Sequence, residues 1–164
     1  NDYGTEENFY QALFQTMVEV KSSLTPEKAR AWYNEKYMPL QVAILAMYFT
    51  ARPLASELLE AMRQQQLKLV LYSDYGCAYE KLQAIGIDPA LFDYVISAPE
   101  LGGLKPSRAS MQRLIEKCGL NPAETLFVGD RQDTDGESAQ AVGMEFYNVK
   151  SDKNAWDELL KCYI

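Results

Sequence analysis

The first third of the chain carries apolar residues at helical spacing. Phe9, Ala12, Leu13, Met17 and Val20 fall at helical spacing, and this period predicts a helix. A second helix is predicted after the Thr-Pro-Glu sequence at 25–27, because Thr is a preferred N-cap and Pro is tolerated in the first turn. We therefore expect residues 1–51 to form a small helical layer.

From Arg52 onward, segments with helical periodicity alternate with short runs rich in apolar, β-branched and aromatic residues. The predicted helices are 54–66, 78–85, a segment from Pro106 to Gly119, 137–142 and a last helix capped by Asn154. The predicted strands are 67–72, 94–97, 124–128 and 145–149. Such alternation is typical of a parallel sheet, so residues 52–164 are expected to form an α/β core.

Histidine is absent from the 164 residues of the sequence. Catalytic triads that contain His, His general bases and His-containing zinc sites are therefore excluded from this chain. Any catalysis must rely on carboxylates, Lys, hydroxyl groups or a bound metal. Carboxylate and metal-phosphate chemistry thus become the first classes to consider.

The net charge is −7, from 16 Lys and Arg against 23 Asp and Glu, and the basic residues do not cluster. No nucleic-acid partner is expected, because non-specific binding depends on neutralising phosphates. No membrane span is expected, since the longest apolar run, 42–49, is far shorter than the roughly 20 residues required. Three widely spaced cysteines without a C-x-x-C pair suit reduced thiols in a cytoplasmic protein.

Polar side chains follow three of the predicted strands, at the edge where α/β sheets bind ligands. Ser73 follows the first strand, Lys105 lies in the loop after the second, and Asp130 and Asp135 lie in the acidic loop after the third. Clustered carboxylate oxygens suit Mg²⁺, which can join them to an anion. A hydroxyl and an ammonium group are suitable donors to a phosphoryl group.

The same residues resemble three motifs of the haloacid dehalogenase-like (HAD) superfamily. Leu-Tyr-Ser73-Asp, Gly-Leu-Lys105-Pro and Val-Gly-Asp130-Arg-Gln-Asp-Thr-Asp135 are similar to its second, third and fourth motifs in order and spacing. The resemblance covers about residues 52–149. It implies a Rossmann-like core with a small helical N-terminal cap, phosphate bound by Ser73 and Lys105, and Mg²⁺ held by Asp130 and Asp135.

The nucleophile of that family, the first Asp of an Asp-x-Asp-x-Thr motif, has no clear counterpart. Aligning Gly4 and the following Thr with the motif places Asn1 and Tyr3 at the two acid positions, and neither can act as the acid. With one residue deleted, Asp2 is the candidate nucleophile. In a third register, these residues form a loop that follows the motif. The sequence of residues 1–5 does not decide among these three alignments.

In the family, the strand that carries this motif is the central one. Without that strand, two strand edges and an apolar slot would face water, and such edges are prone to pair with other chains. A stable monomer of the 164 residues alone would therefore be unexpected. Because the sequence begins with Asn, we expect a trimmed or partial chain, or a fragment or partner that supplies the first strand.

The resemblance implies a Mg²⁺-dependent phosphohydrolase that acts on a small phosphorylated metabolite through an aspartyl-phosphate. A dehalogenase is less consistent with the acidic third loop, because displacement of halide needs no cation. A phosphomutase of the same superfamily stays open. So does a catalytically inactive domain that keeps the fold for binding or as a scaffold.

Overall fold

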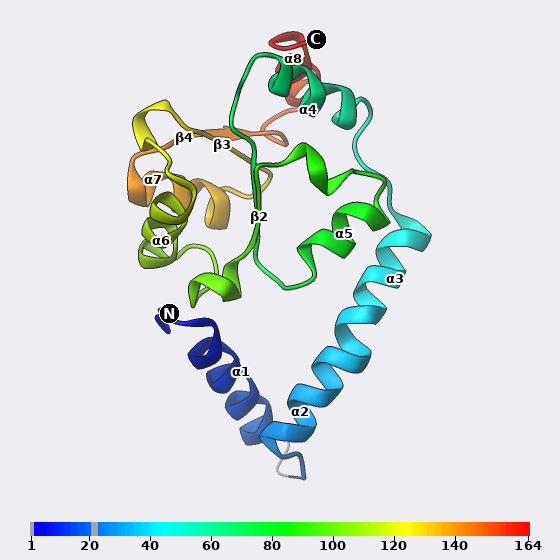
Figure 1. Ribbon diagram of the computed structural model, residues 1–164, viewed down its shortest axis with the longest axis vertical. Coiled ribbons are helices and arrows are strands. Elements are labelled where there is room, and N and C mark those ends of the chain that lie inside the picture. The colour runs from blue at the N-terminus through cyan, green and yellow to red at the C-terminus, as the bar shows by residue number, and fades with distance from the viewer. Residues whose placement is uncertain (1, 21–22) are drawn as a thin grey trace.

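The structure is a computed structural model that describes residues 2–20 and 23–164. Its helical layer consists of α1 (Glu6–Val20), α2 (Pro26–Trp32), the π-helical turn η1 (Tyr33–Tyr37) and α3 (Met38–Tyr48). In Figure 1, α1 and α3 form two arms that diverge from α2. α1 contacts the 3₁₀ turn η3 (Ala98–Leu101), and α3 contacts α5 (Ala78–Ala84). Both arms therefore contact the α/β part of the chain.

Aromatic side chains form the core of the helical layer. Phe14 is 2% exposed, and its ring centroid lies 5.7 Å from that of Tyr33 in an edge contact. Tyr10 stacks on Phe14 at the same distance. The Thr25 hydroxyl accepts the backbone N–H of Lys28 at 3.4 Å, which confirms the predicted start of α2.

The α/β part contains two separate two-stranded parallel sheets. In the first, β1 (Val70–Ser73) pairs with β2 (Tyr94–Ser97), so that Ser73 lies opposite Ser97. In the second, β3 (Leu126–Gly129) pairs with β4 (Glu145–Asn148). Within residues 2–20 and 23–164, no strand joins β1 to β3. Figure 1 shows β2 along the long axis of the molecule and β3 and β4 across it.

The helices of the α/β part flank the two sheets, and their bounds lie close to the predicted ones. Their bounds are α4 (Ala55–Gln64), α5 as given above, α6 (Arg108–Cys118), α7 (Glu137–Val142) and α8 (Ala155–Lys161). Gly119 and Gly143 end α6 and α7 with φ of +58° and +77°, a backbone region that glycine enters at little cost. The predicted boundary between residues 51 and 52 falls between α3 and α4.

Two predicted strands begin later than expected. Residues 67–69 stay outside β1, where the Asp93 carboxylate accepts the N–H of Leu69 at 2.7 Å. Glu124 belongs to the 3₁₀ turn η4 (Pro122–Glu124), because Asn121 caps that turn by accepting the N–H of Ala123. The predicted cap of the last helix is wrong in one detail: Asn154 stands at the N-cap but makes no side-chain hydrogen bond there.

Buried apolar side chains pack on opposite sides of the sheets. The larger group joins the strands to α6 and α7, and its buried members are Ile96, Leu101, Met111, Leu114, Cys118, Ala139 and Met144. A smaller group joins α4 and α8 and contains Leu58, Val149 and Leu159. α4 and α8 lie together near the C-terminus in Figure 1. Helices thus cover both faces, as expected of an α/β core.

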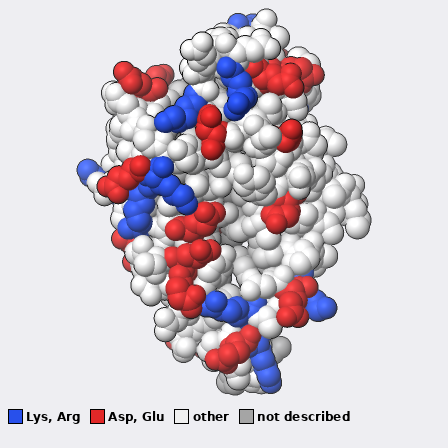
Figure 2. All heavy atoms as spheres, viewed as in Figure 1, with Lys and Arg blue, Asp and Glu red and all other residues white. Residues whose placement is uncertain are grey.

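None of the helices within the described ranges is long and apolar enough to cross a membrane. Figure 2 shows acidic and basic side chains interspersed over one face of the molecule, with no continuous basic surface on it. This face therefore lacks the electrostatic feature that non-specific nucleic-acid binding requires.

Candidate phosphate site at the ends of the strands

Lys105 connects the ends of the two sheets. Its backbone N–H donates to Asp74 Oδ1 at 3.0 Å, next to the end of β1. Its Nζ donates to Asp135 Oδ1 at 2.7 Å, in the loop after β3. The Lys105 side chain is only 11% exposed, and its ammonium group lies 5.4 Å from the ring centroid of Tyr72. The carboxyl ends of β1 and β3 therefore lie side by side, with a largely buried cation between them.

Asp135 holds the loop after β3 in place. The loop contains the π-helical turn η5 (Gln132–Gly136). Asp135 Oδ2 accepts the backbone N–H groups of Asp130 and Arg131, both at 3.2 Å. The side chain is 8% exposed, so the ion pair with Lys105 compensates a buried charge. Asp135 accepts N–H groups that precede it in the chain, so its carboxylate does not cap the helix that follows.

Gly129 is required at the end of β3 because the Asp135 side chain packs against it. A Cβ atom at this position would lie 2.5 Å from Asp135 Oδ2 and 2.6 Å from Asp135 Cβ. Both distances are below any contact that real Cβ atoms make, so a larger residue would displace the buried carboxylate. The glycine that ends β3 ahead of Asp130 therefore has a steric reason.

Asp130 faces a different cation. Its Oδ2 accepts a hydrogen bond from Lys150 Nζ at 2.5 Å, and Lys150 lies just beyond β4. The Asp130 side chain is 43% exposed, so a ligand can reach it from solvent. The hydrogen bond from Lys150 lowers the pKa of Asp130 below its usual value, although partial burial opposes this effect. Asp130 is therefore an accessible, ionised carboxylate at neutral pH.

We expect Lys150→Gln to raise the pKa of Asp130 toward its ordinary value, because the hydrogen bond from Lys150 is the main cause of its lowering. Because Lys150 depresses the folded-state pKa, the pair stabilises the fold above the unfolded pKa, and this contribution is lost as pH falls through the folded pKa. Carboxyl ¹³C NMR of Asp130 between pH 2 and 6 measures the shift. Lys153→Gln, an exposed lysine in the same loop, is the matched control and should leave the Asp130 titration unchanged.

Ser73 ends β1 at the same edge. Its hydroxyl donates to the Tyr75 carbonyl at 3.3 Å, a long hydrogen bond that closes the turn. Ser73 therefore has the local role that a serine at a strand end usually has. A weak bond of this kind can be exchanged for a stronger one to an anion, so this contact is compatible with phosphate binding.

Asp2, the candidate nucleophile, contacts a separate group of residues. Its carboxylate accepts hydrogen bonds from the Arg113 guanidinium and from the Gly4 N–H, the latter at 3.0 Å. The hydrogen bond from Arg113 is the main reason that the pKa of Asp2 is lowered. Asp2 also forms an isolated antiparallel bridge with Gly103, two residues before Lys105. The alternative register that involves Asn1 lies outside the described residues.

Two carboxylates of this edge have the oxygen donors that Mg²⁺ prefers. Asp130 and Asp135 each bind a lysine ammonium group, which shows that both positions accept a cation. Mg²⁺ often uses only one or two carboxylates together with substrate phosphate and water. No group of three or more Cys, Asp or Glu side chains in the described ranges could hold a metal by itself. The residues therefore fit Mg²⁺ in chemistry, with further ligands required from outside this pair.

Three contact residues were missed or set aside in the sequence. Asp74 accepts the backbone N–H of Lys105, although its place after the first predicted strand does not by itself indicate that contact. Lys150 lies two residues beyond β4, so the rule that ligand sites follow strand ends could have found it. Arg113 lies within α6, and nothing in the local pattern signals its contact with Asp2. Asp133 behaves as expected of a solvated residue, with a 66% exposed side chain paired to Arg131.

A sequence model described as haloacid dehalogenase-like hydrolase matches residues 4–143. The chain belongs to this family. A glyceraldehyde 3-phosphate phosphatase of Methanocaldococcus jannaschii is 35% identical over 111 residues, which are 66% of this chain and 46% of that protein. The chain thus spans about half the length of this HAD relative. The family resemblance and the α/β fold predicted from the sequence are both confirmed.

Solved structures agree with the HAD assignment at the level of fold. A HAD phosphatase from Thermococcus onnurineus has a TM-score of 0.58 at 22% identity, over 88% of this chain and 79% of that one. A β-phosphoglucomutase from Clostridium difficile has a TM-score of 0.66 at 16% identity, over 96% and 82% of the two chains. Proteins named for hydrolysis and for phosphoryl transfer thus share this architecture, so the fold alone does not determine the reaction.

Proposed function

We propose that this chain is a phosphohydrolase that acts on a small phosphorylated metabolite. The proposal rests on one observation. Ser73, Lys105 and the loop that contains Asp130 lie at the same edge of the two parallel sheets. Lys105 provides a nearly buried positive charge there, and Ser73 provides a hydroxyl donor. The relative named glyceraldehyde 3-phosphate phosphatase supports a small phosphate ester as substrate.

In the proposed reaction, Lys105 and Ser73 bind the phosphoryl oxygens and stabilise the negative charge that develops on them. Asp135 is a positioning residue, because it fixes the Lys105 ammonium group and the Asp130 backbone together. Asp130 and Asp135 would hold Mg²⁺, which when bound supplies further positive charge to the phosphoryl group. Asp130 could bind the ion only after its hydrogen bond with Lys150 is broken.

The proposed chemistry passes through an aspartyl-phosphate. A carboxylate oxygen forms a bond to phosphorus as the ester P–O bond breaks, and the leaving alkoxide takes a proton from solvent water to become the alcohol. Water then attacks phosphorus, breaks the acyl-phosphate bond and releases inorganic phosphate. Asp2 stays the candidate nucleophile within the described residues, although its present partner is Arg113.

A binding module is the second candidate, because the described contacts place no free carboxylate opposite Lys105. Asp135 already neutralises that lysine, and the other neighbouring acid, Asp74, accepts its N–H. Such a domain would bind phosphorylated ligands at the same edge without hydrolysing them. The three free cysteines suit a reducing compartment, so a cytoplasmic location is part of the proposal.

The function is tested by phosphate release from glyceraldehyde 3-phosphate, other sugar phosphates and an aryl phosphate, with and without Mg²⁺. Release that depends on Mg²⁺ is the expected result. Binding of these esters without release would favour the binding module. Neither binding nor release would contradict both candidates.

Ser73→Ala should raise KM for the phosphate ester about tenfold. The variant removes one hydrogen bond to a charged group, which is worth about 1.5 kcal/mol. Steady-state kinetics on the most active ester of the panel measures the change. The control is Ser23→Ala, because Ser23 is exposed between α1 and α2 in the helical layer. Equal KM values for the two variants would remove Ser73 from the phosphate site.

A further inference from the structure

α3 carries apolar side chains all round its axis. Its sequence, Met38–Tyr48, has no charged residue, and the uncharged stretch runs from 37 to 51. The inner side of α3 is covered, because Met38 is buried, Val42 and Leu45 are half-buried, and the helix contacts α5. A helix that is apolar all round is normally buried on every side. In the part of the chain that the structure describes, the outer side of α3 has no such cover.

Leu40, Ile44 and Met47 lie in a row on this outer side. The steps of four and three residues between them place all three on one face of the helix. Their exposed fractions are 58%, 40% and 69%. Tyr48, which is 74% exposed, lies one turn beyond Ile44. These four residues are called the α3 stripe below.

Trp32 extends the α3 stripe toward α2. Its ring stacks on that of Tyr37 with centroids 5.4 Å apart, and Tyr37 precedes Leu40 by about one helical turn. In Figure 1, α3 forms the right-hand arm of the molecule. Figure 2, which has the same view, shows no charged side chain at the right-hand edge where α3 ends. The α3 stripe and Trp32 thus form one apolar surface along an outer arm.

This apolar surface is large enough for a stable contact between two proteins. Between 40% and 74% of each of its five side chains is exposed. Since burying an aromatic side chain covers about 150–250 Å² and a large aliphatic one somewhat less, the five offer on the order of 600 Å². Two such surfaces bury about 1,200 Å², the lower limit for specific protein–protein interfaces. A dimer formed through them is therefore expected to dissociate in the micromolar range.

The charges of the chain favour a second copy as the partner of this surface. The net charge is −7, so two copies repel each other over most of their surfaces. This repulsion is smallest at the α3 stripe, because residues 37–51 include no Asp or Glu. A nucleic acid or a charged peptide would need opposite charges, which this stretch lacks. The same stripe on a second copy matches it in spacing and in the absence of charge.

We propose that the α3 stripe is the contact between two copies of this chain, packed antiparallel about a two-fold axis. The axis passes between Ala43 and Ile44, at the midpoint of the row from Leu40 to Met47. It places Leu40 of each copy opposite Met47 of the other, so that the same patch serves both subunits. The small side chain of Ala43 allows the two helices to approach closely at the axis.

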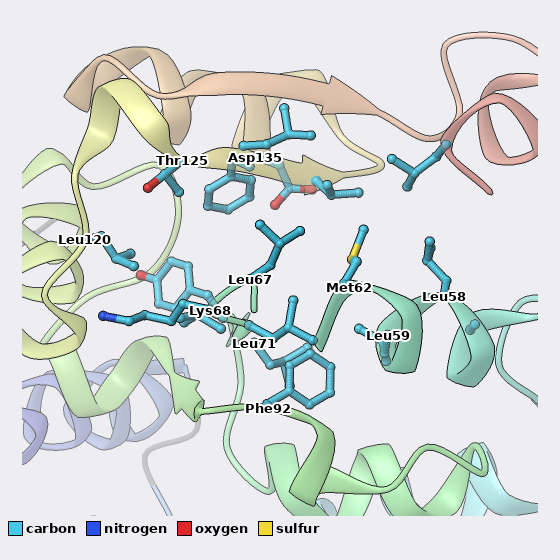
Figure 3. A pocket seen from close by; sticks show the side chains of 18 of the residues that line it. Leu58, Leu59, Met62, Leu67, Lys68, Leu71, Phe92, Leu120, Thr125 and Asp135 are labelled. Carbon is cyan, nitrogen blue, oxygen red and sulfur yellow. The ribbon is translucent and has the colours of Figure 1, made fainter. Parts of the chain in front are cut away.

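Another apolar surface has to be distinguished from the α3 stripe. A cavity of about 690 Å³ lies between β1 and β3, and Figure 3 shows Leu58, Leu71 and Phe92 around it. Among the described residues, α3 contributes none to its lining. Association through this cavity would leave the α3 stripe uncovered, so substitutions in the stripe separate the two surfaces.

The proposal is tested by sedimentation velocity of the full chain at concentrations between about 5 and 200 µM, where mass action should convert monomer to dimer. Leu40→Lys and Met47→Glu should each raise the Kd of the dimer at least tenfold, because each places two charges in an apolar contact. Val20→Glu is the matched control. Val20 is 86% exposed on α1, outside the α3 stripe, so this variant should keep the wild-type Kd.

An equimolar mixture of Leu40→Lys and Met47→Glu tests the antiparallel arrangement. In the mixed dimer, the introduced ammonium group faces the introduced carboxylate, and the other contact keeps its original Leu and Met. The Kd of the mixture should therefore be at least tenfold lower than that of either variant alone. Such recovery requires both variants to be folded, so it separates loss of the contact from loss of the fold.

Three results would overturn the proposal. The first is a wild-type chain that stays monomeric over the whole concentration range. The second is a dimer that both single variants leave intact, which would place the contact elsewhere, as at the cavity between β1 and β3. The third is a mixture that associates no more tightly than the single variants. No catalysis is measured, so these outcomes are independent of the phosphohydrolase proposal.

Discussion

Replacing Lys105 with methionine should destabilise the fold by about 3 kcal/mol, because the change leaves a buried carboxylate without its cation. Asp135 is 8% exposed and keeps only two backbone N–H donors after the substitution. Methionine preserves most of the packing against Tyr72 and Phe127, so the loss is electrostatic in origin. Urea unfolding monitored by circular dichroism measures the change in the free energy of unfolding.

The matched control is Lys117→Met on α6. Lys117 pairs with Glu100 at 3.3 Å, but its side chain is 45% exposed, so the variant should cost less than about 1 kcal/mol. Adding Asp135→Asn to Lys105→Met should recover part of the loss, since the amide oxygen can still accept the two N–H groups. If Lys105→Met costs no more than Lys117→Met, Lys105 is not the charge that Asp135 needs.

Asp130→Asn should reduce Mg²⁺-dependent hydrolysis of an aryl phosphate at least 100-fold, in a form of the protein that shows this activity. The substitution replaces an ionised oxygen donor with a weaker neutral one and lowers the cation affinity on which the proposed activity depends. Little change in stability is expected, because the pair of Asp130 with Lys150 is well exposed to solvent. Initial rates at saturating Mg²⁺, with the thermal midpoint of each variant, separate the two effects.

Asp133→Asn is the control within the same loop. Asp133 is 66% exposed and pairs with Arg131, so its loss should change the rate less than twofold. An Asp130→Asn variant that keeps the wild-type rate would remove Asp130 from the site. Loss of activity together with loss of the fold would instead identify Asp130 as structural.

The order of helices and strands could be predicted because the local signals are strong. α7 was placed at 137–142 from its apolar period and from Gly143, whose positive φ ends the helix. Leu67 was assigned to a strand because it begins an apolar run, but no neighbouring strand pairs with it. Apolar composition alone does not show where pairing begins, so such limits require knowledge of the partner strand.

The sequence indicated the residues of the candidate site more fully than the contacts between them. Ser73, Lys105, Asp130 and Asp135 all lie at or after strand ends, and Asp135 contacts both Lys105 and Asp130. Their assignment to a phosphate and metal site stays a prediction. The ion-pair partner of each charged side chain was not predicted. Asp130 pairs with Lys150, twenty residues away, and Asp2 pairs with Arg113 on α6. Ion pairs of this kind depend on how loops return to the sheet edge, which spacing along the chain does not encode.

The most direct test of the phosphate site is a titration of the chain with inorganic phosphate, observed by ³¹P NMR with and without Mg²⁺. We predict binding that Mg²⁺ strengthens and that Ser73→Ala weakens about tenfold, in line with the loss of one charge-assisted hydrogen bond. Phosphate that does not bind, or that binds equally well to Ser73→Ala and to the wild type, would contradict the placement of the site at the ends of β1 and β3.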